Sequence, residues 1–350
     1  PVSPSRHEPL QYRFKNLVRG GQPMSLKDAR GRPLRDLRIS VTDRCNFRCT
    51  YCMPREHFNS EHSFLPREEL LSYEEITAVV ASILPLGLQK IRLTGGEPLL
   101  RKNLIGLISQ LRNLSNSIDI ALTTNGALLK QNARALHDAG LNRVTVSIDA
   151  LDPDVFQAMA DSTQWTPEDV IEGIIEAKRV GLGVKVNTVV KKNLNEDQIL
   201  PLLNQFQELE IPLRFIEFMD VGNTNAWNLN DVVSGEDIRR SIESKFGKLT
   251  PVPPASRGEV AKRFTLPSGY EIGCIESVTA PFCGDCTRAR LSANGSLYTC
   301  LFASKGNDLK SMLRMNATSD EISNAIQSIW VKRSDRYSEE RSEHTNSMKK

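Results

Sequence analysis

The sequence lacks the features that would place the protein in a membrane, outside the cell or on nucleic acid. No apolar run approaches a length of about 18 residues, which a membrane-spanning helix needs, so we expect no membrane partner. Residues 1–21 lack the apolar core of a signal peptide, which argues against secretion. The formal net charge of +3 is too small to indicate a nucleic-acid partner.

Cysteine is scarce, and its distribution is uneven. Six of the seven cysteines fall into two tight sets. Such sets predict metal sites in a reducing compartment rather than disulfides, so we expect a cytoplasmic protein. The hydrophobic content of 39% and the charged content of 25% are ordinary for a globular protein. A chain of 350 residues is long enough for one large domain and a smaller one.

The first cysteine set contains Cys45, Cys49 and Cys52, with the spacing C-x3-C-x2-C, directly after an apolar run at 37–42. Three thiolates can hold three corners of a 4Fe–4S cluster, whose usual complement is four, so one iron would remain open. Zinc is one alternative, but a structural zinc site normally takes four ligands in paired C-x2-C units. Buried structural cysteines are another, but polar neighbours such as Arg44 would pack poorly in a core. The spacing therefore favours an iron–sulfur cluster.

Together with Tyr51, the three cysteines resemble the signature of the radical S-adenosylmethionine (radical SAM) enzymes. The resemblance implies that SAM binds the open iron through its amino and carboxylate groups. It also implies that the reduced cluster cleaves SAM to a 5′-deoxyadenosyl radical. The turn Thr94-Gly95-Gly96-Glu97-Pro98 is a weak motif alone, because such turns also join ordinary strands and helices. After the cysteine motif, it resembles the glycine-rich motif that receives the amino group of SAM.

Strand-like and helix-like segments alternate through most of the chain, which predicts an α/β fold with a parallel sheet and right-handed crossovers. The predicted strands are 37–42, 90–94, 118–123, 143–148, 183–190 and 213–219, and the predicted helices are 72–84, 104–111, 128–139, 167–180, 196–208 and 235–246. Ser72 and Glu75 form a predicted capping box. The alternation alone does not distinguish an open sheet from a barrel. The radical SAM resemblance implies a partial six-stranded (β/α) TIM-type barrel.

Polar residues share one face of several predicted strands, because alternate residues of a strand point to the same side. The pairs are Arg38 and Ser40, Arg92 and Thr94, Lys185 and Asn187, and Glu217 and Met219. Charged residues in buried strands are rare unless they are paired or bind a ligand. We favour ligand binding near the C-terminal ends of the strands. An ion pair of Lys185 or Arg92 with Glu217 is the alternative.

The second cysteine set contains Cys283, Cys286 and Cys300, with the spacing C-x2-C-x13-C. The remaining cysteine, Cys274, lies in an apolar strand pattern at 270–275, where cysteine usually behaves as a small buried hydrophobe. Without Cys274, a four-ligand zinc site is incomplete. We therefore expect a C-terminal extension that carries a second iron–sulfur cluster with an open iron.

Two arginines lie between Cys286 and Cys300 of the second set, and their spacing places both on the same face of a strand. They are Arg288 and Arg290. Planar guanidinium groups suit phosphate oxygens. The predicted barrel adds further positive charge through Arg38, Lys90, Arg92 and Lys185. Together these side chains predict a small polyanionic substrate.

Three segments, 43–54, 93–98 and 281–288, narrow the resemblance to the GTP 3′,8-cyclase family, which performs the first step of molybdenum cofactor (molybdopterin) biosynthesis. The similarity extends over residues 34–341. It implies that the adenosyl radical takes the ribose 3′ hydrogen of GTP and that C3′ then bonds to C8 of guanine, giving 3′,8-cyclo-7,8-dihydro-GTP. The implied cofactors are SAM and two 4Fe–4S clusters, with no catalytic side chain beyond these groups.

The same resemblance assigns ligands to individual residues. It implies SAM binding by Tyr51, Gly96, Ser147 and Met219, and GTP binding by Arg38, Arg92, Thr123, Lys185, Arg288, Ala289 and Arg290. The free iron of the second cluster would face the guanine. The implied partners are an electron donor and, downstream, cyclic pyranopterin monophosphate synthase. A homodimer is a candidate assembly.

Composition divides the chain into four parts. We expect an irregular N-terminal arm at 1–35, the radical SAM partial barrel at 36–230, an auxiliary-cluster domain at 250–333 and a mobile polar tail at 334–350. Three prolines within 250–258 predict a linker, and 222–230 is a predicted loop.

One feature departs from the family, and two other classes of function remain open. Chains of the family end in a double glycine that enters the active site, whereas this sequence ends Met348-Lys349-Lys350. A peptide-modifying radical SAM maturase is the first alternative, although 1–35 contains no convincing peptide-binding element. The second is a non-catalytic iron–sulfur or zinc protein.

Overall fold

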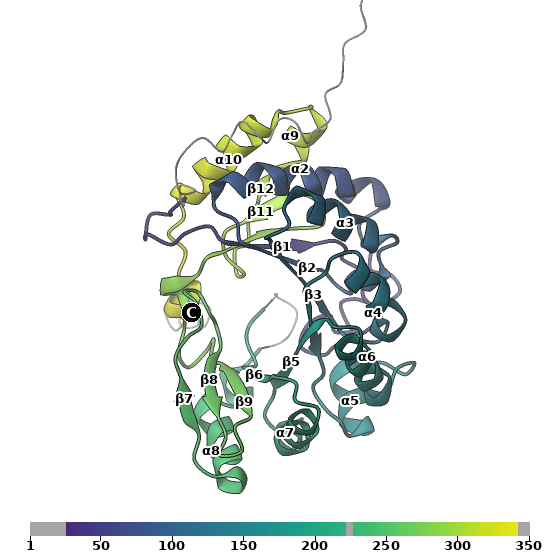
Figure 1. The fold of residues 1–350 in the computed structure, drawn as a ribbon, viewed down its shortest axis with the longest axis vertical. Helices are drawn as coiled ribbons and strands as arrows, with labels where there is room; N and C mark the ends of the chain where they lie inside the picture. Colours follow the sequence, from purple (N-terminus) through teal and green to yellow (C-terminus); the bar gives the residue numbers. More distant parts are fainter. Residues whose placement is uncertain (1–25, 222–226, 342–350) are drawn as a thin grey trace, which may run out of the picture.

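The fold is organised by one curved β-sheet. The computed structural model describes residues 26–221 and 227–341. Within these residues twelve strands form one sheet, in the order β12-β11-β10-β1-β2-β3-β4-β5-β6-β9-β8-β7. Figure 1 shows the sheet as an open arc with helices on its outer side. The arrangement is therefore a partial barrel.

The central strands of this sheet run parallel, and the parallel part is larger than predicted. In spatial order the parallel strands are β10 (Arg288–Leu291), β1 (Asp36–Ser40), β2 (Lys90–Thr94), β3 (Asp119–Thr124), β4 (Arg143–Ser147), β5 (Gly183–Val190), β6 (Leu213–Glu217) and β9 (Glu271–Ile275). The predicted α/β class and parallel partial barrel are confirmed, and β1 to β6 occupy the six predicted strand segments. The predicted count of six is too low, because β9 and β10 add one parallel strand at each edge.

Antiparallel strands continue the sheet beyond each edge of the parallel part. They are β11 (Ser296–Tyr298) and β12 (Asn307–Asp308) beyond β10, and β8 (Lys262–Thr265) and β7 (Thr250–Val252) beyond β9. The linker predicted at 250–258 is therefore wrong at its start, where β7 forms. An edge strand tolerates Pro251, because one side of that strand needs no backbone N–H.

Helices cover the outer face of the sheet. They are α2 (Tyr73–Ile83), α3 (Leu104–Leu114), α4 (Leu129–Asp138), α5 (Pro153–Ala160), α6 (Pro167–Arg179), α7 (Ile199–Glu208), α8 (Gly235–Phe246), α9 (Lys310–Arg314) and α10 (Ser319–Val331). The predicted capping box is confirmed: Glu75 N donates to Ser72 Oγ at 3.0 Å, and Ser72 N donates to Glu75 Oε2 at 2.6 Å. In the described part of the chain, no helix is long and apolar enough to cross a membrane.

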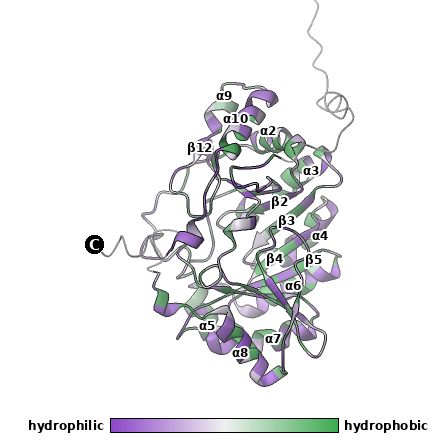
Figure 2. Ribbon diagram, turned by 90° about the vertical axis from the view of Figure 1, so that its left-hand side faces the viewer, coloured by the Kyte–Doolittle hydropathy of each residue, from purple (hydrophilic) through white to green (hydrophobic). Residues whose placement is uncertain are grey.

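The two faces of the parallel sheet differ in polarity. In β1, Leu37 and Ile39 are fully buried toward the helices, whereas Arg38 and Ser40 are partly exposed toward the barrel interior. Burial of each apolar side chain of this size contributes about 1.5–3 kcal/mol. The outer helices complement this pattern, with hydrophobic and hydrophilic residues on different faces (Figure 2). The packing thus leaves polar side chains inside the barrel.

Glu217 is an exception to the predicted strand parity. Its carboxylate is 1% exposed and accepts hydrogen bonds from the backbone N of Gly235 at 2.8 Å, and of Val278 and Thr279 at 2.9 Å each. It therefore faces α8 rather than the interior. The predicted shared face with Met219 and the alternative ion pair with Lys185 or Arg92 are both wrong for Glu217. Strand β6 ends at Glu217, so the alternation of side chains between the two faces of the strand does not extend to Met219.

The two ends of the described chain are more ordered than predicted. Within the expected irregular arm, Asp28 and Arg32 are buried. Within the expected mobile tail, Tyr337 Oη donates to Asp220 at 2.7 Å, and Arg341 Nε donates to the same carboxylate at 2.9 Å. The tail prediction is therefore wrong for 334–341. The rest of the predicted arm and tail, including the C-terminal lysines, lies outside the described residues, as does 222–226 of the predicted loop. The remainder of that loop, 227–230, is described and contains the start of the 3-10 helix Leu229–Asp231.

Candidate functional site

The first cysteine set follows β1 and contacts the glycine turn after β2. Gly96 N donates to Thr42 O at 2.9 Å, and Glu97 N donates to Arg44 O at 2.8 Å. A Cβ atom at Gly96 would clash with Arg44 O and lie 3.0 Å from Cys45 N. The glycine thus has a local role in addition to the SAM contact implied by resemblance, because only glycine allows the two loops to approach this closely.

The thiols of the first set lie close enough to influence one another's ionisation. Burial, followed by Cys52, Asp149 and Cys45, raises the pKa of Cys49 well above its usual value. Burial likewise raises the pKa of Cys45 to about 11. Three thiolates here would need a compensating positive charge, which a metal cluster supplies.

The cysteine sets do not surround a single ion position. Among residues 26–221 and 227–341, no three His, Cys, Asp or Glu side chains form a group that could hold one metal ion. A cubane cluster attaches each thiolate to a different iron, so it does not require such convergence.

Tyr51 is fixed to the ends of β4 and β5. Its hydroxyl donates to Asp149 Oδ2 at 2.6 Å, and Val189 N donates to Asp149 Oδ1 at 2.8 Å. Asp149 follows β4 just beyond Ser147, so two of the residues expected to bind SAM belong to connected segments. On another side of the motif, Asn125 Nδ2 donates to Asn46 Oδ1 at 2.8 Å. No local pattern in the sequence indicates these contacts between distant segments.

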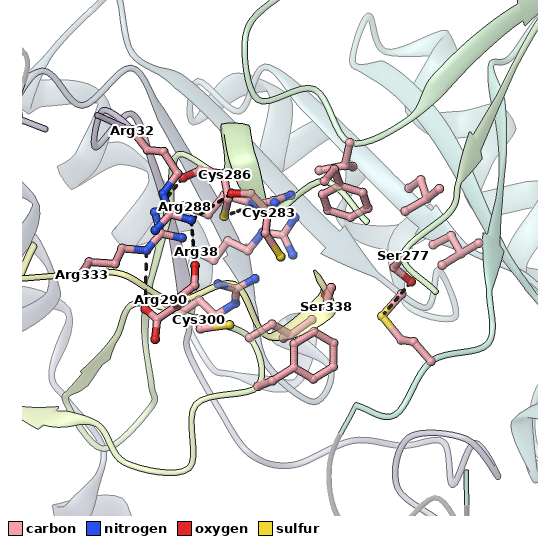
Figure 3. Close-up of a pocket in the computed structure, with 18 of the residues that line it drawn as sticks. Arg32, Arg38, Ser277, Cys283, Cys286, Arg288, Arg290, Cys300, Arg333 and Ser338 are labelled. Carbon is pink, nitrogen blue, oxygen red and sulfur yellow. Dashed lines mark hydrogen bonds and ion pairs between the residues drawn. The ribbon is translucent and has the colours of Figure 1, made fainter. Parts of the chain in front are cut away.

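The second cysteine set lines a cavity together with arginines from β1 and β10. Figure 3 shows Cys283, Cys286 and Cys300 around the side chains of Arg38, Arg288 and Arg290. These six residues were predicted for the second cluster or for GTP, and the fold brings all of them together. The same cavity extends to Asn187, Ile275, Ser277 and Met219.

The two cysteine sets lie at opposite ends of the parallel sheet. Strands β1 and β10 are parallel neighbours, and Asp36 pairs with Arg288 at the start of both. Cys286 precedes β10, whereas Cys45 follows β1. The cavity lined by the second set also reaches Met219, which follows β6 and was expected to bind SAM. The barrel interior therefore connects the two ends.

Cations from several strands face this interior. Arg92 Nη1 donates to Thr123 Oγ1 and to Thr145 Oγ1, both at 3.1 Å. Burial and neighbouring arginines lower the pKa of Arg38 and of Arg290 to about 9, and that of Lys185 to about 8. Positive charge is thus concentrated where an anion would relieve the mutual repulsion.

Two further interior cations were missed by the sequence predictions. Strand register places Arg214 beside Asn187, and Arg143 level with Arg92 across β3. Arg143 Nη2 contacts Asp119 Oδ2 at 2.6 Å, whereas Arg214 lies 3.9 Å from Glu259. In β6, Leu213 is buried on the outer face of the sheet, so the next residue, Arg214, points into the barrel. A prediction that assigned these two faces correctly would have identified Arg214.

Several interior polar atoms have no hydrogen-bond partner among the described residues. They are Arg38 Nε, Arg290 Nε, Arg290 Nη1 and Asn187 Oδ1, all from residues that line the cavity. A buried polar atom without a partner is costly, so these atoms indicate a polar ligand.

Two further residues of the predictions, Ala289 and Cys274, have buried side chains. Ala289 has no exposed surface and points away from Arg288 and Arg290, so its side chain has no access to a ligand in the barrel. Cys274 is 1% exposed within the apolar core, as predicted for a small buried hydrophobe.

A partial barrel with three cysteines beyond its first strand and a Gly-Gly turn beyond its second defines the chain as a radical SAM protein. Residues 39–206 match the model of the Radical SAM superfamily, and residues 211–339 match that of Molybdenum Cofactor Synthesis C. The fold is also that of Streptococcus suis SuiB bound to S-adenosylmethionine. That comparison has a TM-score of 0.58 at 16% sequence identity and covers 85% of this chain and 68% of SuiB.

Curated relatives narrow this class further. A GTP 3′,8-cyclase of Staphylococcus haemolyticus is 48% identical over 322 residues, which cover 91% of this chain and 94% of the relative. A GTP 3′,8-cyclase of Staphylococcus aureus is 47% identical with the same coverage. The chain belongs to the GTP 3′,8-cyclase family.

Proposed function

We propose that the protein is a radical SAM lyase that converts GTP to 3′,8-cyclo-7,8-dihydro-GTP, the first step of molybdenum cofactor biosynthesis. The observation that carries the proposal is the interior cavity, which joins the second cysteine set to buried arginine atoms without partners. The radical SAM cysteine motif lies at the other end of the same barrel. Identity of 46–48% to curated GTP 3′,8-cyclases supports the choice of substrate.

At the first end, Cys45, Cys49 and Cys52 would hold a 4Fe–4S cluster. When bound there, the cluster and SAM supply the radical that removes a hydrogen from the ribose. SAM would contact Tyr51, Gly96, Ser147 and Met219. Asp149 keeps Tyr51 in place, because its carboxylate binds both Tyr51 Oη and the backbone of β5.

Along the barrel, the interior cations would bind the triphosphate. Arg38, Arg92 and Lys185 come from three different strands, and Arg214 adds a fourth position. Thr123 orients Arg92 through the 3.1 Å hydrogen bond and remains close enough to share a phosphate oxygen. Charged hydrogen bonds of this kind contribute about 1.5–3 kcal/mol each.

At the second end, Cys283, Cys286 and Cys300 would hold a second 4Fe–4S cluster whose open iron faces the guanine. Burial opposes ionisation of Cys286, but Arg288 and Arg333 outweigh it and lower the pKa of this thiol to about 6. A thiolate that forms readily suits a cluster ligand. Asn187 offers an acceptor beside it, and Arg290 offers unpaired donors that would bind a phosphate of the same nucleotide.

The chain's main contribution is to hold the nucleotide in one orientation while keeping water out. Formation of the C3′–C8 bond requires the guanine to be fixed against the ribose, and such positioning governs rates by orders of magnitude. The barrel would fix both ends of the nucleotide, the phosphates through the interior cations and the guanine through the second site. An external electron donor would be needed, and the product would pass to cyclic pyranopterin monophosphate synthase in the cytoplasm. The homodimer remains a candidate assembly.

Anaerobic reconstitution tests this proposal. Two cubane clusters predict about eight irons and about eight sulfides per chain. Incubation with SAM, dithionite and GTP should then yield 5′-deoxyadenosine and cyclised GTP in equal amounts. Zinc in place of iron, or 5′-deoxyadenosine without any cyclised nucleotide from fully loaded protein, would contradict it.

A further inference from the structure

A buried ionic cluster lies behind the second cysteine set and joins the two ends of the described chain. Arg32 Nε donates to Asp28 Oδ2 at 2.6 Å, and Arg333 Nη1 donates to the same oxygen at 3.1 Å. All three side chains are at most 1% exposed. Asp28 Oδ1 also accepts from the backbone N of Arg30 and Arg32, at 2.9 Å each. The carboxylate therefore organises both arginines and the turn that carries one of them.

Other donors of the two arginines bind the backbone of the cysteine loops, and Arg32 Nη1 also donates to Asp335 O at 2.8 Å. Arg32 Nη1 donates to Cys283 O at 2.9 Å. Arg333 Nη1 donates to Cys286 O at 2.7 Å, and Arg333 Nε donates to Thr299 O at 3.0 Å, immediately before Cys300. Each segment that supplies a cysteine of the second set is thus held by this cluster.

We propose that Asp28, Arg32 and Arg333 are positioning residues of the second cysteine site, which fix the three thiols so that they face one cavity. The inference rests on the second cluster of the proposed function. The three cysteines belong to two separate segments, and the 3-10 turn Cys283–Asp285 has no side-chain cap of its own. A rigid element from outside the two segments is therefore needed to hold them in a fixed position relative to each other.

The cluster acts mainly through geometry, although Arg333 also lowers the pKa of the Cys286 thiol. Asp335 lies 3.6 Å from Arg333, so two arginines face two carboxylates and the group is formally neutral. A buried ion network of this kind seldom adds net stability over apolar packing, but it fixes directions strongly. Arg32 also lines the cavity, and its Nη2 has no partner among the described residues. It therefore presents one donor to whatever occupies the cavity.

The test uses protein in which the first site is removed, so that all iron reports on the second. In a Cys45→Ala, Cys49→Ala, Cys52→Ala background, the proposed function predicts about four irons per chain and one reduced-cluster EPR signal. Adding Arg333→Met should reduce the iron content at least about twofold, or shift and broaden the EPR signal, while circular dichroism shows a folded chain. The same iron content and the same EPR spectrum as the background would overturn the positioning role.

Two further variants keep the test decisive. If Arg333→Met does not fold, Arg333→Lys replaces it: lysine keeps the charge but cannot reach Asp28, Cys286 O and Thr299 O together, so a changed spectrum is expected and an unchanged one overturns the inference. Arg239→Met is the matched control. It removes an ion pair with Glu276 in the same half of the chain, without a contact to the three cysteines, and should leave iron and spectrum unchanged. A background protein that binds no iron would instead refute the proposed second cluster itself.

Discussion

Arg288 and Arg290 face the same cavity, but their guanidinium groups have different contacts. Arg288 Nε donates to Cys286 Sγ at 3.3 Å, and its guanidinium lies over the Phe282 ring. Arg290 Nε and Nη1 have no partner within the described chain. Two residues that the sequence treats as equivalent should therefore serve different functions.

This difference predicts separable effects of substitution. Arg290→Ala should weaken GTP binding more than guanosine binding, by about 1.5–3 kcal/mol per lost charged hydrogen bond, with iron content unchanged. Arg288→Ala should instead lower the iron content of the second site, because it removes a hydrogen bond to the sulfur of Cys286, a proposed cluster ligand. Equilibrium binding and iron analysis distinguish the two. Equal losses for GTP and guanosine in Arg290→Ala would contradict phosphate recognition by Arg290.

Lys185 should make GTP affinity depend on pH. Burial, together with Arg214 and Arg143, lowers the pKa of Lys185 to about 8. The ammonium form attracts phosphate, and it is lost from the free protein as the pH rises through about 8. GTP affinity should therefore be constant below this pH and fall above it. Lys185→Arg should move the decline to higher pH, because arginine has a higher intrinsic pKa than lysine and even the buried Arg38 and Arg290 keep their protons to about pH 9. Parallel pH profiles of the two proteins' dissociation constants would contradict the assignment.

At the scale of single residues, local spacing in the sequence predicts many residues of the site. Contacts between residues that are far apart in the sequence could not be predicted. The cysteines, Arg38 and Arg290 could be found because motif spacing and strand parity involve neighbouring residues. Arg214 was missed because the parity of β6 was assigned from Glu217, which faces outward. The contact of Asp28 with Arg333 joins residues 305 positions apart, and no local pattern indicates it.

The glycine turn between β2 and α3 leaves no room for a side chain at Gly96. Gly96→Ala would place a methyl group against the Arg44–Cys45 backbone, and overpacking of this kind costs about 1–3 kcal/mol. Because the atoms in the way are backbone atoms of the cysteine loop, the first cluster site should move. Iron content should fall by about four per chain, and 5′-deoxyadenosine formation should cease.

Gly269→Ala provides the control for this prediction. Gly269 has φ +86°, so alanine there is strained, but no heavy atom lies within 4 Å of its added Cβ. This variant should lose some stability and keep its iron. If Gly96→Ala retained all its iron and cleaved SAM normally, the close contact between the two loops would have no functional role.

At the scale of elements, the sequence predicts those with strong periodicity and misses some of the short ones. The six predicted strands, β1 to β6, and the cap of α2 follow from alternation and capping residues. Strand β10 has only four residues, and its pairing with β1 depends on the fold as a whole. Helix α5 has eight residues and was not predicted, although Asp152 caps its first turn.

The whole molecule places two cysteine sites at opposite ends of one barrel, with the cationic interior between them. The second site is built from the C-terminal segment and is held by Asp28 and Arg32 from the N-terminal part of the described chain. The first site depends on β1 and β2 and makes none of these contacts. The two sites should therefore be separable by mutation.

Cys283→Ala should separate radical formation from cyclisation. The first site alone, with SAM and an electron, suffices to release 5′-deoxyadenosine, whereas cyclisation also needs the guanine held against the ribose. The variant should keep about four irons and some SAM cleavage, while the yield of cyclised GTP per 5′-deoxyadenosine falls by orders of magnitude.

Cys274→Ala is the matched control, because it removes a buried thiol outside the cavity and should leave both yields unchanged. A structural role for the second cluster predicts instead that Cys283→Ala loses folded structure, which circular dichroism would detect. A folded Cys283→Ala protein with about four irons that cyclises GTP at the normal rate would exclude a substrate role for the second site, because the base would then be positioned without it.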